Sequence, residues 1–249
     1  MKKRKPVSSA KAQVIIFKFD DVIELGANGG GPVSPRWRRV TDYIEKNHLK
    51  ASSGVICDSL EGDQPAYFKW IKEHHKNGAV EFWLHGYRTH ARHPEDKTGE
   101  FEQGTWQEHK ALLDRCERLA REKLGFEFAA FGPHWSSTTE ATDRALEAVP
   151  QVKIWLCGPK KPKYFSRLSL PRVMSLEDPI FVPDFKKFER TYKKLAAGLD
   201  MLVLQGHPDL WKVETKWEGF ERIVEFLKSK GCVFMTPSEY LAWVRKKGK

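Results

Sequence analysis

Two carboxylates stand side by side at the end of the first predicted strand. The stretch Val14–Val22 reads VIIFKFDDV, which is typical of a short buried strand that ends in Asp20 and Asp21. Because neighbouring residues on a strand point to opposite faces, we expect the two acids to have different neighbours and different tasks. For an Asp pair taken alone, the alternative is a plain structural role as a helix cap or turn residue.

Histidines follow two other predicted strands in the same way. Residues 79–84 (AVEFWL) lead into His85, with His90 five residues further on, and residues 201–206 (MLVLQG) lead into His207. A single histidine in such a place is more often structural than a ligand, but strand ends meet at one rim of a parallel α/β barrel. Two imidazoles and a carboxylate can hold a catalytic zinc or related divalent ion with an open position for water. The metal lowers the pKa of that water, a second carboxylate accepts its proton, and a further histidine protonates a leaving amine. These parts predict hydrolysis of an amide or an ester.

The elements that would position these residues alternate between strands and helices along the chain. Eight strands with crossover helices predict a parallel sheet, and that number favours a closed barrel over an open sheet. We interpret residues 14–249 as a single domain that follows a basic tail, residues 1–13. The strands are expected near residues 14–22, 53–57, 79–84, 127–131, 152–156, 170–173, 201–205 and 233–235, and the helices near 35–47, 65–76, 105–124, 138–148, 185–197, 216–230 and 237–246.

The net charge of +10 comes mostly from the two ends of the chain. Clusters of four basic residues at each end leave little excess charge in the body, and no basic run interleaved with aromatics lies between them, which argues against a nucleic-acid partner.

No apolar run is long enough to span a membrane. The basic start lacks an apolar signal segment, so the chain as written is expected to be cytoplasmic, although an exported protein trimmed of its leader would look the same. The four cysteines have no C-x-x-C spacing, which argues against a zinc–thiolate site.

From Val14 to Trp243 the chain resembles the polysaccharide deacetylases, the NodB-homology group of carbohydrate esterases (family 4-like), and in particular a divergent branch with a His-Gly-Tyr metal motif. The resemblance is carried by Phe-Asp-Asp after the first strand, the block EFWLHGY, the segment FGPHW at residues 131–135, and the late strand that ends in His207-Pro. It implies a distorted (β/α) barrel, commonly of seven strands, a divalent metal held by Asp-His-His, and removal of acetyl groups from amino sugars. Zinc is the first expectation for the metal, with manganese, cobalt or nickel as alternatives.

The resemblance also assigns roles to individual residues. Asp20 matches the general base and His207 the general acid that protonates the departing amine. Asp21, His85 and His90 match the three metal ligands, with His93 as the alternative to His90, because the family spaces its two histidines four apart and here they are five apart. The backbone around Pro133 and His134 matches the place where the family stabilises the oxyanion, and Trp135 matches a wall of the acetyl pocket.

Two supporting residues of the family are not found at their usual places. Gly132 or a neighbour stands where the family has an arginine that orients the catalytic aspartate. Its usual partner, an acid within an Asp-Trp pair, is also missing, and Asp178 and Asp184 are the nearest acids. The sequence therefore predicts a replaced set of supporting residues, and it supports metal binding better than it supports robust deacetylation.

Aromatic residues near the predicted strand ends suit a carbohydrate substrate. Trp135 and Trp211 each flank a motif residue and are expected to line the cleft, although packing explains most of the nine tryptophans without a ligand. The leading hypothesis is a metal-dependent hydrolase that removes acetyl groups from an N-acetylated or, second, an O-acetylated saccharide. The alternatives are a non-catalytic carbohydrate-binding module on the same fold and a hydrolase of small non-sugar amides.

Overall fold

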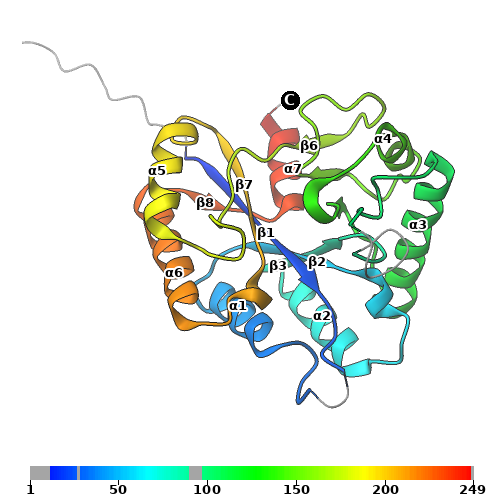
Figure 1. The fold of residues 1–249 in the computed structure, drawn as a ribbon, viewed down its shortest axis with the longest axis horizontal. Helices are drawn as coiled ribbons and strands as arrows, with labels where there is room; N and C mark the ends of the chain where they lie inside the picture. The colour runs from blue at the N-terminus through cyan, green and yellow to red at the C-terminus, as the bar shows by residue number, and fades with distance from the viewer. Residues whose placement is uncertain (1–11, 27–28, 90–96, 248–249) are drawn as a thin grey trace, which may run out of the picture.

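A curled parallel sheet forms the centre of the molecule (Figure 1). The structure is a computed structural model that describes residues 12–26, 29–89 and 97–247. Its strands lie in the order β6-β5-β4-β3-β2-β1-β7, and β8 pairs with the start of β1. Every pairing is parallel, as predicted. The strands are β1 (Val14–Val22), β2 (Ala51–Val55), β3 (Val80–Leu84), β4 (Ala130–Phe131), β5 (Ile154–Leu156), β6 (Leu168–Leu170), β7 (Met201–Gly206) and β8 (Val233–Phe234).

Helices surround this sheet, with α5 and α6 side by side on one flank and α3 and α4 on the other (Figure 1). Each helix lies close to the range predicted for it, because the apolar periodicity that indicates a helix is also what packs it on the sheet. The helices are α1 (Pro35–Lys46), α2 (Pro65–Asn77), α3 (Trp106–Leu119), α4 (Glu140–Glu147), α5 (Phe185–Leu195), α6 (Glu214–Ser229) and α7 (Pro237–Lys247), with short turns η1 (Cys57–Leu60), η2 (Ala120–Leu124), η3 (His134–Ser136) and η4 (Pro208–Leu210).

The distorted (β/α) barrel is confirmed, but it does not close as the strand count had suggested. Within the described residues β6 and β7 are the two ends of the sheet and do not pair with each other. The segment after β6 spans this seam instead, and the backbone N–H of Leu176 donates to the carbonyl of Gln205 on β7 at 3.1 Å. Strand β6 has only three residues. The connection that follows it, rather than a strand, therefore makes the contacts across the gap between β6 and β7. We call residues 171–184 the seam segment.

Strand β1 divides the core into two layers by simple alternation. Ile15, Phe17 and Phe19 belong to the large apolar cluster between sheet and helices, whereas Val14 and Ile16 belong to a smaller cluster inside the barrel. The same alternation continues the inner row into Lys18 and Asp20, which are both buried. Two charged side chains of this strand therefore face the barrel interior.

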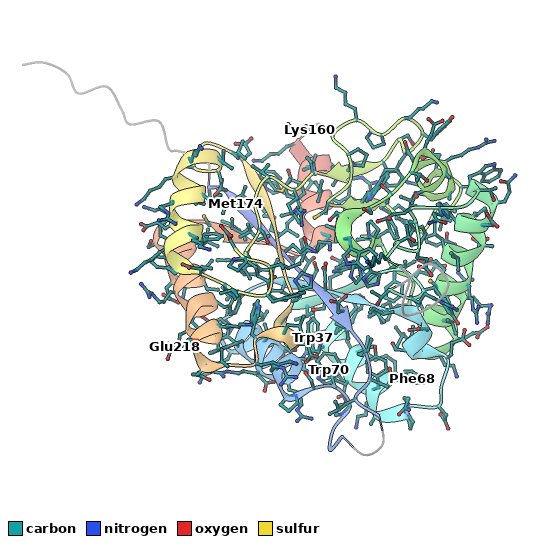
Figure 2. The ribbon with its side chains drawn as sticks, viewed as in Figure 1. Trp37, Phe68, Trp70, Lys160, Met174 and Glu218 are labelled. Atoms are coloured by element: carbon teal, nitrogen blue, oxygen red, sulfur yellow. The ribbon has the colours of Figure 1, made fainter. Side chains whose placement is uncertain are left out.

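Large aromatic side chains fill much of the core (Figure 2). Trp37 of α1 and Trp70 of α2 are buried between the sheet and its helical cover. Inside the barrel, Trp83 of β3 is fully buried over Gly54 of β2. A Cβ at position 54 would lie 2.4 Å from the Trp83 ring, so the neighbouring strand must carry glycine there. None of the described helices is both long and apolar enough to cross a membrane.

Candidate active site

A β-bulge at the end of β1 turns Asp21 back toward the site. The register of β1 against β2 shifts between Phe19 and Val22, and Asp21 has a φ of 75°, in the left-handed region that non-glycine residues rarely adopt. Both carboxylates therefore approach His85, whose Nε2 lies 3.7 Å from Asp20 Oδ2 and 3.2 Å from Asp21 Oδ1. The expectation that the two acids point to opposite faces is wrong, because the bulge resets the alternation on which it rested.

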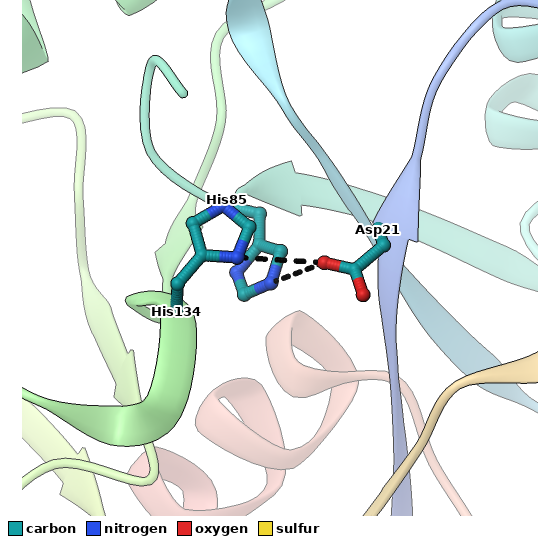
Figure 3. Close-up of side chains that lie close together, drawn as sticks. All are labelled: Asp21, His85 and His134. Carbon is teal, nitrogen blue, oxygen red and sulfur yellow. Dashed lines mark ion pairs between the residues drawn. The ribbon is translucent and has the colours of Figure 1, made fainter. Parts of the chain in front are cut away.

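Asp21, His85 and His134 form a compact cluster at the carboxyl ends of the strands (Figure 3). His85 follows β3 and His134 opens η3 directly after β4, and His134 Nδ1 lies 3.4 Å from Asp21 Oδ1. One potential ligand atom from each residue lies within 4.8 Å of the other two. Burial alone would raise the pKa of Asp21, but hydrogen bonds from His134 and His85 hold it well below its usual value. The carboxylate is thus ionised between two imidazoles.

The donor set fits a divalent cation. His85 Nδ1 donates to the carbonyl of Gly132 at 2.5 Å, so Nε2 donates to Asp21 only when both ring nitrogens carry a proton. In the neutral ring, Nε2 turns a lone pair toward the Asp21 carboxylate. Two acceptors that face each other at 3.2 Å require a proton or a cation between them. Burial, together with the neighbouring His85, lowers the pKa of His134 to about 4, so its ring is neutral and able to act as a ligand. A backbone carbonyl that fixes the tautomer of a ligating histidine is a common feature of metal sites.

The second histidine of this cluster, His134, is not the one expected from the sequence. His90 and its alternative, His93, lie outside the described residues, so their role as a ligand remains a prediction. Among the described residues the third member of the cluster is His134, which the sequence had suggested only as part of an oxyanion site. The sequence did contain a signal for His134, because the segment FGPHW, like His85, comes at the end of a predicted strand. Pro133 opens the same turn, and its part in stabilising an oxyanion remains a prediction.

Asp20 lies beside the cluster, held by two donors. Lys18 Nζ contacts both of its oxygens at 2.6 and 2.7 Å, and Gln205 Nε2 donates to Oδ2 at 2.6 Å. Burial alone would raise the pKa of Asp20, but the charge of Lys18, followed by those of His85 and His207, brings it below its usual value. Asp20 is therefore an ionised carboxylate at neutral pH despite its burial.

His207 faces Asp20 from the far side of the site. Its Nε2 lies 3.9 Å from Asp20 Oδ2, while its Nδ1 donates to Glu177 Oε2 at 2.8 Å. Burial alone would lower the pKa of His207, but the Glu177 hydrogen bond and the charge of Asp20 raise it above its usual value. The protonated ring is thereby stabilised with its Nε2 directed at the site.

Glu177 is the acidic partner of His207, a contact that the sequence did not predict. It lies on the seam segment and also accepts hydrogen bonds from the His207 backbone and from Trp211 Nε1, both at 2.7 Å. The two acids named from the sequence lie elsewhere, since Asp184 caps α5 and Asp178 forms an ion pair with Lys187. The missed signal was a single glutamate next to Asp178, with no tryptophan beside it to mark it.

The two tryptophans expected to line a cleft have different environments. Trp135 is 47% exposed and has a φ of 55°, so its ring stands next to His134 on a strained, solvent-facing turn. Trp211 is 4% exposed and packs edge-on to Phe19 in the core. Its indole N–H supports Glu177 behind the site, so the expectation that Trp211 lines an open cleft needs correction. A tryptophan next to a motif residue in sequence can be exposed at the site or buried behind it. Position along the chain therefore did not distinguish Trp135 from Trp211.

Comparison with known proteins identifies the fold. No protein-family model matches the chain, and no curated protein sequence matches it. Among solved structures, a family 4 acetyl xylan esterase from Clostridium thermocellum, in complex with cobalt, is similar with a TM-score of 0.63 at 16% identity over 93% of this chain and 91% of its own. The catalytic domain of a peptidoglycan N-acetylglucosamine deacetylase from Eubacterium rectale has a TM-score of 0.58 at 16% identity over 94% and 92% of the two chains. A family 4 (CE4) pseudoenzyme from Bacillus anthracis has a TM-score of 0.59 at 12% identity over 93% of this chain and 66% of its own.

The chain therefore has the fold of the family 4 carbohydrate esterases, the polysaccharide deacetylase fold. At these identities the likeness concerns the fold alone. The pseudoenzyme shows that a protein with this fold can lack activity.

Proposed function

We propose that this chain is a metal-dependent hydrolase that removes acetyl groups from a saccharide. The observation that carries the proposal is the arrangement around Asp20. His85 of the Asp21–His85–His134 cluster lies 3.7 Å from Asp20 Oδ2, and His207, with its partner Glu177, lies 3.9 Å from the same oxygen. A base and an acid next to a candidate metal site are the parts that acyl hydrolysis requires.

Asp21, His85 and His134 would hold the metal, with His90 as the alternative third ligand. A divalent ion bound there would polarise the acetyl carbonyl and lower the pKa of a water. Zinc is the first expectation from the nitrogen-rich donor set, and manganese, cobalt or nickel are alternatives.

The remaining steps belong to side chains of this protein. Asp20 is ionised and accepts the proton of the attacking water. His207 carries a proton at Nε2, with Nδ1 held by Glu177, and delivers it to the departing amine or hydroxyl group of the sugar. Trp135 offers an exposed ring beside His134, on which a sugar face can stack.

We place an N-acetylated amino sugar first and an O-acetylated sugar second. Fold neighbours named as an N-acetylglucosamine deacetylase and as an acetyl xylan esterase support both possibilities. The protonated His207 is most useful for the N-acetyl case, because an amine leaving group must gain a proton as the bond breaks.

Acetate release together with metal content tests the proposal. Purified protein supplied with zinc, cobalt or manganese is assayed on chitooligosaccharides, acetylated xylooligosaccharides and small acetamides, beside Asp20→Asn and His85→Ala. We expect release from a saccharide, loss of metal in His85→Ala, and loss of turnover with metal retained in Asp20→Asn. Turnover that survives Asp20→Asn would refute the assignment of the base. Sugar binding without release from any substrate would favour a binding module, and release from small amides alone would favour a non-sugar hydrolase.

A further inference from the structure

Lys18 is a lysine with no exposed surface, enclosed in the barrel interior. Its Nζ lies 2.6 and 2.7 Å from the two oxygens of Asp20 and 4.7 Å from the centre of the Trp83 ring. Burial of an ammonium group is costly unless it is paired, so its retention here depends on the carboxylate and on the aromatic face. The partner it has is the residue to which we assign the proton transfer.

Gly132 provides the space that Lys18 occupies. A Cβ at position 132 would lie 2.9 Å from Lys18 Cε, 3.0 Å from the Trp83 ring and 3.4 Å from Leu156 Cβ. Gly132 is not among the residues with positive φ, so its backbone does not demand glycine. The reason for glycine at this place is steric, since any side chain there would meet the lysine stem.

The other side of Asp20 is fixed as well. Gln205 Nε2 donates to Asp20 Oδ2, and its amide oxygen accepts a hydrogen bond from Arg172 of the seam segment. The arginine contact determines which end of the amide faces the carboxylate. Asp20 is thus clamped between Lys18 and Gln205, with Oδ2 between His85 and His207.

We propose that Lys18 is the positioning residue for Asp20, and that Gly132 is glycine in order to admit it. This inference rests on the proposed function and adds the source of the positive charge behind the base. The proposal requires a positively charged side chain next to Asp20, but this side chain does not have to belong to β1. If Lys18 is shortened, its 2.9 Å contact with a Cβ at position 132 is removed, and an arginine there supplies the charge from the residue that follows β4 instead.

Relocating the charge tests this proposal. The proteins compared are the wild type, Lys18→Ala, Gly132→Arg, Lys18→Ala/Gly132→Arg and the neutral control Lys18→Ala/Gly132→Met, each assayed for acetate release and metal content. We expect Lys18→Ala to lower kcat about 10–100-fold with KM nearly unchanged and metal retained, as loss of a supporting residue does. Gly132→Arg alone is also impaired, because two side chains compete for one space. The arginine double variant regains at least tenfold in kcat over Lys18→Ala, whereas the methionine control does not.

Two results would overturn the inference: wild-type kcat in Lys18→Ala, or equal recovery in the arginine and methionine double variants, which would show that the space alone matters. A second measurement does not need turnover. In thermal unfolding of Lys18→Met, Asp20→Asn and the double variant, each single change leaves one buried charge without its opposite charge, so the loss of Tm in the double variant should be smaller than the sum of the two single losses. Additive losses would refute the pairing. A wild type that releases no acetate from any substrate but shows this coupling would count against the proposed function and leave the Lys18–Asp20 arrangement standing.

Discussion

Replacing Glu177 by glutamine tests the role of His207 as the general acid. The carboxylate of Glu177 accepts four N–H groups, from the His207 backbone at 2.7 Å, His207 Nδ1 at 2.8 Å, Trp211 Nε1 at 2.7 Å and the Phe181 backbone at 2.9 Å. A glutamine has the same shape but only one acceptor oxygen. If that oxygen serves Trp211 and the His207 backbone, the amide NH2 faces His207 Nδ1 and the N–H of Phe181.

The cost follows from these contacts. The N–H of Phe181 loses its acceptor in a half-buried place, which destabilises the protein by about 1–3 kcal/mol. An NH2 group can only donate to His207, so Nδ1 must become an acceptor and the neutral ring is favoured. Since the Glu177 hydrogen bond is the largest influence that raises the pKa of His207, that pKa falls in Glu177→Gln. Fewer molecules then hold His207 as an imidazolium, and the neutral ring, whose one proton is on Nε2, is a far weaker acid toward the leaving group.

The assay is kcat for acetate release from a chitooligosaccharide between pH 5 and 9. In the wild type, kcat falls as pH rises through the pKa of His207, and in Glu177→Gln this fall moves to lower pH. At pH 8 we expect a loss of about 100-fold, within the range of a general acid. Glu81→Gln is the matched control, because Glu81 is a buried carboxylate near the start of β3 that accepts hydrogen bonds from Ser238 and can affect stability alone. An unchanged pH profile in Glu177→Gln would refute the assignment of His207 as the acid.

Three further changes address the metal, the fold and the substrate. His134→Ala should lose most of the bound metal while His90→Ala keeps about one ion per chain by elemental analysis; the reverse result would assign the third ligand to His90. Burial raises the pKa of Glu100 to about 7, so its contribution to stability is full below pH 4.5 and is lost as pH rises through about 7. Wild-type stability should thus fall by up to about 3 kcal/mol over that interval in chemical denaturation, and a Glu100→Gln variant with the same slope would contradict this origin. Trp135→Ala should raise KM for an oligosaccharide about tenfold with little change in Tm, because the ring is half exposed, and an unchanged KM would exclude sugar stacking there.

The fold and half of the site were predictable because they depend on local pattern. The apolar runs of β1, β3 and β7 identify strands by themselves, and a polar residue at the end of such a run lies at the rim of the barrel. This argument places Asp20, His85 and His207 together without any knowledge of their contacts.

The rest depends on interactions that leave little trace in the sequence. A bulge adds one residue and reverses the direction of Asp21, and no residue type announces it. Glu177 reaches His207 only because the sheet fails to close and a connecting segment crosses the gap. Lys18 looks like an exception in an apolar strand until Gly132, more than a hundred residues later, is found to leave room for it.

The open seam between β6 and β7 divides the site into two parts of unequal construction. The Asp21–His85–His134 cluster is held at the ends of hydrogen-bonded strands, whereas Glu177 and Arg172 belong to a connection outside the sheet. In the proposed mechanism, substitutions in that connection can therefore disable the proton donor while the cluster persists. In evolutionary terms, the proposed hydrolase has a short route to a sugar receptor without turnover, because changes confined to the seam segment can disable the proton donor and leave the residues that would hold the ion in place.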